Sequence, residues 1–285
     1  MRAVLWNPNI MNSFYVDNAK CRKDGICAAV CPVGIIKAKP KELPTLDDSK
    51  AGRCIRCGQC MAFCPTQACS APGLSLDDCR FLQPELYAST EQLEELVFSR
   101  RSIRNFKNKP VPHEVLERII DSCRWAPTGH NRQAYRWIIL ESRGEVAAFL
   151  DLFFEWLEKL PEVDPEEAEH AHATGVVRAW KERGLDVITR GAPHIVITAG
   201  PEGDSQLADG TIALTYFELL AQSLGVGCMW SGYFLRMFRH HSGTAAREYL
   251  GLKPGELAYG GQVVGYPKFT AVSRPPRDPL RVLWK

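Results

Sequence analysis

The sequence predicts an α+β protein made of two domains with different chemistry. Nine of the eleven cysteines lie between Cys21 and Cys79, and the 206 residues that follow hold only Cys123 and Cys228. Helical and strand patterns fill the later part of the chain without strict alternation, which favours α+β packing over a doubly wound sheet. At 285 residues the chain is long enough to bury a substantial core.

Composition excludes several classes of partner. Lys and Arg total 35 against 33 Asp and Glu, a net charge of +2, so no strong field favours nucleic acid or an acidic membrane surface. Residues 1–12 lack the apolar run of a signal peptide. No stretch approaches the roughly 18 apolar residues of a membrane span. We therefore expect a soluble, cytoplasmic protein with no nucleic-acid or membrane partner.

The densest motif is a run of four cysteines and a proline. Its spacing, Cys54-x2-Cys57-x2-Cys60-x3-Cys64-Pro, is that of bacterial ferredoxins that bind a [4Fe–4S] cluster. Three thiolates on a tight loop can each reach a different iron, and the fourth points away. A four-cysteine zinc site is the main alternative, but zinc usually takes two separated pairs. Disulfides would have to close very short loops.

A second copy of the motif lies 33 residues upstream. Cys21, Cys27 and Cys31 match Cys54, Cys60 and Cys64 in register, and Asp24 stands where the later copy has Cys57. This repeat resembles the two-cluster ferredoxins, in which the last cysteine of each motif ligates the opposite cluster. The resemblance implies one cluster on Cys54, Cys57, Cys60 and Cys31. It implies a second on Cys21, Cys27 and Cys64, with Asp24 as a candidate fourth ligand.

Asp24 has two interpretations. As a ligand it would be harder than thiolate and would hold its iron less firmly, giving an Asp-ligated [4Fe–4S] or a [3Fe–4S] cluster. As part of Lys23-Asp24-Gly25 it would simply be a turn residue. Cys69 and Cys79 fall outside both motifs and receive no role.

The domain boundary is expected near residue 80, giving a cluster domain over 1–80 and a second domain over 81–285. Ser89-x-x-Gln92 has capping-box spacing at the start of a helix. Periodicity predicts helices over 90–99, 113–124, 144–159, 167–183, 205–224 and 243–250, and strands over 135–140, 194–199 and 258–264. The 205–224 helix is apolar almost all round, which is typical of a buried or interface helix.

Three segments of the second domain carry candidate binding residues. Arg100, Arg101, Ser102 and Arg104 can clamp a phosphate, although alone they would equally fit a solvated helix end. Thr128, Asn131 and Gln133, on a Pro/Gly loop over 126–133, offer a hydroxyl and two amides to the edge of a heterocycle. The small residues of 225–232 would let backbone approach a flat ring.

In this order the three segments resemble the nitroreductase family of FMN enzymes, over about residues 90–285. The resemblance implies a central mixed or antiparallel sheet and a homodimer with FMN at the interface. It places the phosphate and ribityl chain on Arg100, Arg101 and Ser102, and Arg104 near the pyrimidine side of the ring. It further implies contacts from Thr128, Asn131, Gln133, Ser231 and Gly232, with Arg274 or Arg277 completing the phosphate site. No catalytic residue follows.

These features predict an iron–sulfur flavoprotein oxidoreductase, because clusters carry single electrons and flavin can gather two. The leading hypothesis is reduction of an electron-poor small molecule such as a nitroaromatic, a quinone or an activated alkene. One alternative is an electron-transfer module for a protein partner. Another is a specialised reductive reaction, such as dehalogenation or flavin remodelling. NAD(P)H and a ferredoxin or other redox protein both remain open as donors.

Overall fold

The structure is a computed structural model that describes residues 14–285. The chain divides into two compact units, one of residues up to 87 together with 130–132, the other of 88–129 and 133–285. Each unit is described by itself. Among the described residues, no helix has both the length and the apolar character needed to cross a bilayer.

The first unit repeats one backbone pattern twice. Helix α1 (Ile26–Ala29) and helix α2 (Gln59–Ala62) lie 33 residues apart. Before each helix stands a glycine with positive φ, 75° at Gly25 and 70° at Gly58. Two antiparallel pairs complete the unit: β1 (Tyr15–Val16) with β4 (Cys69–Ser70), and β2 (Ile36–Lys37) with β3 (Thr45–Leu46). The sequence repeat is thus a repeat of structure.

The core of the first unit is small and rich in sulfur. Its fully buried members include Ile35, Ile36 and Met61, but the thiols of Cys27, Cys60 and Cys69 are buried with them. A unit of this size buries too little apolar surface to be very stable unaided. Whatever binds these thiols therefore contributes directly to the stability of the fold.

The second unit is organised on one antiparallel sheet. Its strands are β5 (Arg136–Leu140), β6 (His194–Pro201), β7 (Gly227–Trp230) and β8 (Glu256–Gly265), in the spatial order β5-β6-β8-β7. Every neighbouring pair is antiparallel. An antiparallel sheet with helices on its faces is the α+β arrangement that the sequence predicts.

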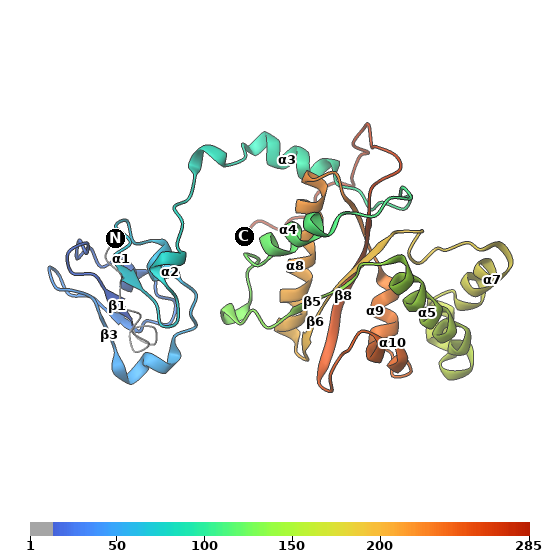
Figure 1. Cartoon of the computed structure of the whole chain (residues 1–285), viewed down its shortest axis with the longest axis horizontal. Coiled ribbons are helices and arrows are strands. Elements are labelled where there is room, and N and C mark those ends of the chain that lie inside the picture. Colours follow the sequence, from blue (N-terminus) through green and yellow to red (C-terminus); the bar gives the residue numbers. More distant parts are fainter. Residues whose placement is uncertain (1–13) are drawn as a thin grey trace. The chain divides into compact units, whose positions relative to one another are not determined.

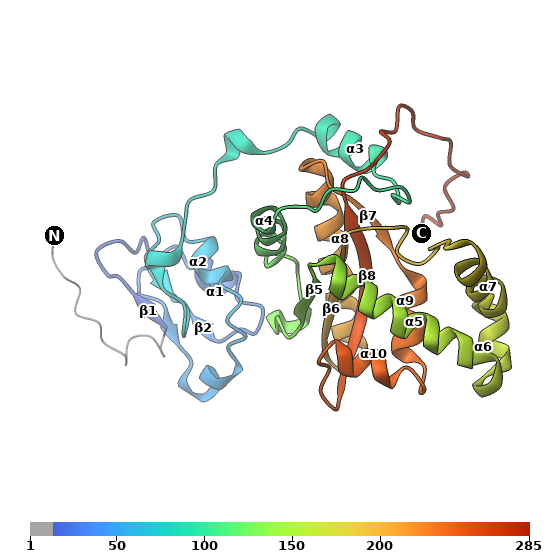
Figure 2. The same ribbon diagram turned by 45° about the vertical axis from the view of Figure 1, so that its right-hand side comes forward.

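Helices cover both faces of this sheet (Figures 1 and 2). On one face lie α8 (Asp204–Ser223) and α4 (His113–Cys123), packed against Val196 of β6. On the other lie α5 (Arg143–Val163), α9 (Gly232–Arg239) and α10 (Thr244–Tyr249), packed against Ile195 and Ile197. The alternation along β6 reflects the two-residue period of a strand with both faces buried.

Helix α3 (Thr90–Ser99) begins at the predicted capping box. Ser89 Oγ accepts from the Gln92 N–H at 3.2 Å, and the Gln92 side chain accepts from the Ser89 N–H at 2.9 Å. At its far end, Ser99 and the carbonyl of Leu96 accept from the Gln222 side chain, which fixes α3 against the end of α8. The residue that follows α3 is Arg100.

One prediction of secondary structure is wrong, and one strand is missed. The helix expected over 167–183 is two helices, α6 (Pro165–His170) and α7 (Ala173–Arg183), because His172 adopts a left-handed conformation between them. Residues 227–230, for which the sequence analysis predicts no strand, form β7, and α9 follows directly. The apolar spacing Phe234, Met237 and Phe238 marks the buried face of α9.

The buried His194 makes the second unit sensitive to acid. Its Nε2 accepts from the Val111 N–H at 2.8 Å, so Nδ1 donates to the Glu141 carbonyl at 2.7 Å and the ring is neutral. Burial lowers the pKa of His194 below its ordinary value of about 6.5. Between these two pKa values His194 is protonated in the unfolded chain and neutral in the folded chain. The free energy of unfolding therefore decreases as pH falls below about 6.5.

We predict that His194→Gln flattens this pH dependence. Thermal unfolding followed by tryptophan fluorescence should fall in midpoint between pH 7.5 and pH 5.5 more steeply for the wild type than for the variant. Glutamine keeps an acceptor for Val111 but cannot titrate. Equal pH slopes in the two proteins would contradict the assignment of the neutral ring.

Candidate functional site

The last cysteine of the first motif lies with the cysteines of the second motif. Cys31 lines a cavity in the first unit, with an empty volume of about 380 Å³, together with Cys54, Cys57 and Cys60. The remaining wall is apolar, and Ile36 belongs to it. The four thiols that the ferredoxin resemblance groups together therefore share one cavity.

A second cavity has the complementary set. Its empty volume is about 320 Å³, and Cys21, Asp24, Cys27 and Cys64 line it. Cys69 lines it as well. The crossing of the two motifs thus holds in both directions, because Cys31 and Cys64 each join the cavity of the opposite motif.

Backbone N–H groups point at several of these sulfurs. The Ala68 N–H donates to Cys64 Sγ at 3.2 Å, and the Lys23 N–H donates to Cys21 Sγ at 3.4 Å. A hydrogen bond from Cys69 lowers the pKa of Cys27 to about 7, and a similar bond lowers the pKa of Cys60. Such donors favour thiolate, the form that binds metal. The donor set therefore fits thiolate-bound clusters.

Asp24 and Cys69 behave differently in the second cavity. Asp24 is exposed, and its Oδ1 accepts from the Ile26 N–H at 3.1 Å, as in an Asx turn. Cys69 is 2% exposed and donates to the Cys60 carbonyl at 3.1 Å. Hydrogen bonding to Cys27 and Cys60 raises the pKa of the Cys69 thiol. Cys79 lines neither cavity.

In the second unit, backbone hydrogen bonds fix residues 100–107, here called the arginine-rich segment, against the sheet. The Ile103 N–H donates to the Cys228 carbonyl at 2.9 Å, and the Lys107 N–H donates to the Tyr266 carbonyl at 2.8 Å. The segment therefore runs beside β7 and the end of β8. Gly227 permits this approach, because a Cβ there would lie 2.5 Å from Ile103 Cγ1 and 2.9 Å from Pro267 Cγ.

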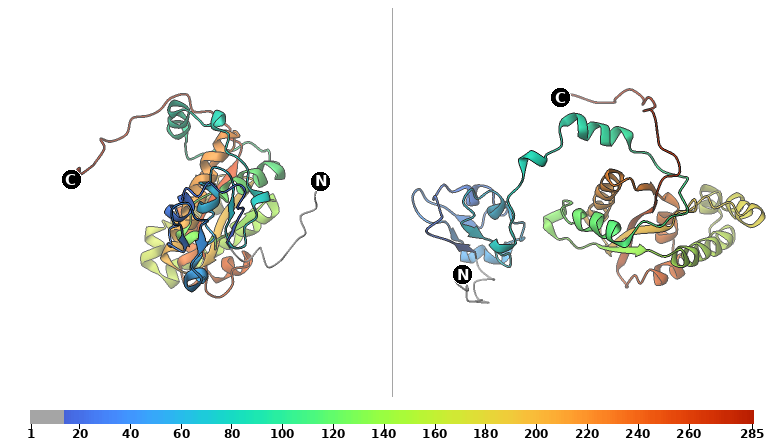
Figure 3. Two further views of the ribbon diagram at one scale, coloured as in Figure 1. Left: turned by 90° about the vertical axis from the view of Figure 1, so that its left-hand side faces the viewer. Right: turned by 45° about the horizontal axis from the view of Figure 1, so that its top comes forward.

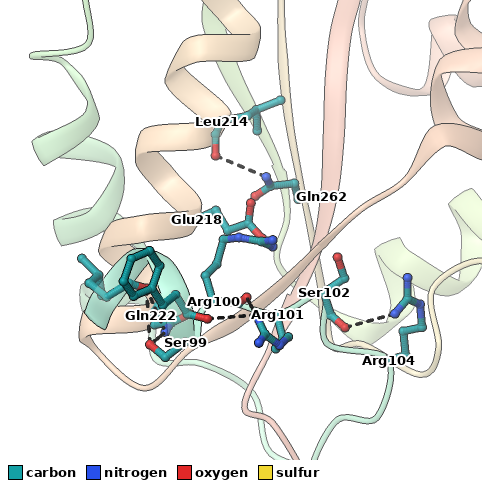
Figure 4. Close-up of polar contacts among 11 residues, drawn as sticks. Ser99, Arg100, Arg101, Ser102, Arg104, Leu214, Glu218, Gln222 and Gln262 are labelled. Carbon is teal, nitrogen blue, oxygen red and sulfur yellow. Dashed lines mark hydrogen bonds and ion pairs between the residues drawn. The ribbon is translucent and has the colours of Figure 1, made fainter. Parts of the chain in front are cut away.

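The guanidinium groups of this segment are held by different partners (Figure 4). Arg100 pairs with Glu218 of α8 at 2.8 Å. Arg101 donates to the carbonyls of Phe98 and Arg100, at 2.9 and 2.7 Å. Arg104 is exposed and, among the residues that the structure describes, donates only to the Ser102 carbonyl, at 3.4 Å. Three cations and one hydroxyl within five residues make a donor set suited to phosphate.

Arg274 lies beside the same segment. Its guanidinium carbon is 4.1 Å from the centre of the Phe98 ring, on the last turn of α3. Arg277 is exposed and follows three residues later, in the segment that leaves β8 and extends away from the sheet (Figure 3). Arg274 therefore lies against the last turn of α3, directly before Arg100.

A buried amide lies close to the Arg100–Glu218 pair. Gln262 of β8 is 1% exposed, and its Nε2 donates to the carbonyl of Leu214, one helical turn before Glu218. Within residues 14–285, its Oε1 has no hydrogen-bond partner. A buried acceptor without a donor is costly, so it marks a place where a bound group with an N–H or O–H would be stabilised.

The 126–133 loop is anchored at the opposite end of α8. The Gly129 N–H donates to Asp209 at 2.9 Å, and Thr128 Oγ1 accepts from the Gln133 N–H at 3.2 Å. Asp209 and Glu218 are nine residues apart, or roughly 14 Å along a helix. Residues 130–132 group with the first unit, and Asn131 has a positive φ of 53°. Within the second unit, Gly129 and Arg100 therefore attach to opposite ends of α8.

Ser231 and Gly232 lie where β7 passes into α9. Ser231 is 3% exposed, and its N–H donates to the Gly261 carbonyl at 3.0 Å. Gly232 is exposed, and a Cβ added there would meet no atom within 4 Å. Among the glycines of 225–232, Gly227 is the one that a neighbouring segment approaches closely. The aromatic residues Phe153, Phe154 and Trp156 of α5 pack in the core.

Comparison with known proteins gives the family. The model of the Nitroreductase family matches residues 97–266, well over half of the chain. The chain belongs to the nitroreductase family. A 4Fe-4S dicluster domain matches residues 13–65, ahead of the nitroreductase domain. The predicted fusion of a two-cluster ferredoxin domain with a nitroreductase domain is therefore confirmed.

Curated relatives and solved structures agree with this family. A protein of Methanothermobacter thermautotrophicus, provisionally assigned as an NADH dehydrogenase/NAD(P)H nitroreductase, is 27% identical over 49% of this chain, which spans 60% of that relative. An iodotyrosine deiodinase of Haliscomenobacter hydrossis is 23% identical over 59% of this chain and 70% of its own length. An FMN-bound nitroreductase structure from Bacteroides fragilis superposes with a TM-score of 0.57 at 18% identity, over 69% of this chain and all of its own.

We predict that Gly227→Ala destabilises the second unit by about 1–3 kcal/mol, the usual cost of overpacking. The new methyl group would push Ile103 and the arginine-rich segment away from β7. Gly175→Ala is the matched control, because a Cβ at that position of α7 meets nothing within 4 Å. Urea unfolding should separate the two variants, and equal midpoints would contradict the tight packing at Gly227.

Proposed function

We propose that the protein is an iron–sulfur flavoprotein oxidoreductase that passes electrons between two ferredoxin-type clusters and FMN to reduce an electron-poor organic substrate. The observation that carries the proposal is the occurrence of both donor sets in one chain. Two thiol-lined cavities lie in the first unit, and a cationic phosphate segment is fixed to the sheet of a nitroreductase domain. Clusters supply one-electron transfer, and flavin supplies the conversion to two-electron chemistry.

The first cluster belongs to Cys31, Cys54, Cys57 and Cys60. These thiols share one cavity, and Cys60 has the lowered pKa of a stabilised thiolate. The second cluster belongs to the cavity of Cys21, Cys27 and Cys64, where Asp24 is a candidate fourth ligand. N–H donors to ligand sulfurs, such as that of Ala68, would stabilise the more negative reduced state of a cluster and raise its potential.

The flavin phosphate belongs to Arg100, Arg101, Ser102 and Arg274. Arg104, exposed and only weakly held, is free to turn its charge toward the flavin ring and stabilise the anionic reduced form. The open space around Gly232 and the free N–H groups in the first turn of α9 suit the approach of the reactive edge of the ring. Arg277 is the alternative to Arg274.

A homodimer would complete the flavin site. Ile212 and Tyr216 of α8 remain 36% and 40% exposed, although the opposite side of the helix is fully buried. The 126–133 loop and the arginine-rich segment attach to α8 roughly 14 Å apart. A partner chain packed on α8 would bring Thr128, Asn131 and Gln133 of one copy to the arginines of the other. The site would then draw on both chains.

Reductive dehalogenation is the second candidate for the reaction. It is favoured by the likeness to the iodotyrosine deiodinase of Haliscomenobacter hydrossis over 59% of this chain. Both candidates use the same flavin, the same electron supply and the same phosphate residues. A third hypothesis is that the protein is an electron-transfer module that serves a protein partner and reduces small molecules only incidentally.

We predict separate effects for two residues of the flavin segment. Ser102→Ala should weaken FMN binding about 10- to 100-fold, the loss of one charge-assisted hydrogen bond. Arg104→Gln should leave binding closer to normal and lower the midpoint potential of the bound flavin. Isothermal titration and anaerobic redox titration measure the two effects. Arg183→Gln, an exposed arginine at the end of α7, is the control.

The substrate class is tested with anaerobically reduced, cofactor-replete protein. We expect flavin absorbance to return rapidly with a nitroaromatic, a quinone or an activated alkene. Rapid return only with iodotyrosine would favour dehalogenation. Sluggish return with every small molecule, together with fast exchange with a reduced or oxidised ferredoxin, would favour the electron-transfer module and overturn the proposal.

A further inference from the structure

The two cluster cavities differ at two equivalent positions. Because the repeat has a period of 33 residues, Asp24 corresponds to Cys57 and Cys69 corresponds to Ile36. Ile36 lines the first cavity and Cys69 lines the second. The second cavity has thus lost the thiol of the motif and gained one in the wall. Each cavity contains four cysteine side chains.

Cys69 does more than fill space in the core, because its thiol lies beside an expected cluster ligand. It lies on β4, five residues after Cys64, and is 2% exposed. Its thiol hydrogen bonds to Cys27, an expected ligand of the second cluster, and to the Cys60 carbonyl. It is therefore already in contact with a cluster ligand, inside the cavity that this ligand lines.

Asp24 is the weaker candidate for iron. Its side chain is exposed, and Oδ1 is occupied by the Ile26 N–H at the start of α1. Iron in a sulfide cluster prefers thiolate to a carboxylate oxygen. The Asx turn that Asp24 forms is explanation enough for aspartate at this position.

We propose that Cys69 is the fourth iron ligand of the second cluster, in place of the motif cysteine that Asp24 replaces. This proposal rests on the assignment of clusters to the two cavities. Ligation forms one Fe–S bond, releases the thiol proton to solvent and changes no oxidation state. The Cys69 sulfur gives up its hydrogen bond to the Cys60 carbonyl, and the charge of the iron drives its deprotonation.

The consequence is a complete [4Fe–4S] cluster in the second cavity, with no labile iron at Asp24. Anaerobically purified wild-type protein should therefore contain about eight irons per chain, four for each cluster. Asp24→Ala should keep this content. Cys69→Ala should lose one iron and gain the paramagnetic resonance signal of an oxidised [3Fe–4S] cluster, and the signal of the reduced first cluster should persist.

A rescue variant separates ligation from folding. Restoring the motif in the double variant Asp24→Cys/Cys69→Ala should return the iron content to that of the wild type and abolish the [3Fe–4S] signal. Cys79→Ala, which removes a thiol outside both cavities, is the matched control and should change neither quantity.

Three results would overturn the proposal. One is full iron content in Cys69→Ala, and another is loss of iron in Asp24→Ala alone. The third is a folded double variant that stays at the iron content of Cys69→Ala. A wild-type protein with no iron–sulfur signal in either cavity would instead contradict the assignment of the clusters, so the two failures are distinguishable.

Discussion

The crossing of the two cysteine motifs is the constraint on which the first unit depends. Cys31 completes the cavity of the second motif, and Cys64 completes that of the first. Neither half of the repeat can form a binding site alone, so cluster assembly and folding of the unit are one process. The small core, in which thiols replace much of the usual apolar packing, makes this coupling strong.

The second unit depends in the same way on one close approach. Gly227 allows Ile103 to lie against β7, and the two backbone hydrogen bonds at Ile103 and Lys107 hold the arginine-rich segment along the strand ends. The Arg100–Glu218 pair then ties that segment to α8. Positioning by backbone and by a partly buried ion pair leaves Arg104 exposed and free to meet a ligand.

Local patterns predict much of this architecture, and long-range ones do not. Ser89 and Gln92 predict the start of α3, and the 33-residue repeat predicts both cavities. Both patterns can be recognised because their residues lie close together in the sequence. The motif does not predict the placement of Cys69, which lines the second cavity from β4, the strand that pairs with β1. Likewise β7 is not predicted, because the glycines of 225–232 are unfavourable in a strand. It forms by pairing with β8.

The proposed function requires electrons to pass between the clusters and the flavin of one protein. Oxidised, cofactor-replete protein should be mixed anaerobically with limiting one-electron reductant, and cluster and flavin absorbance should be followed together by stopped flow. We expect flavin bleaching to follow cluster bleaching at a rate that is independent of protein concentration. This rate should fall sharply in Cys57→Ser. Flavin reduction that is unchanged in Cys57→Ser would contradict the proposed function.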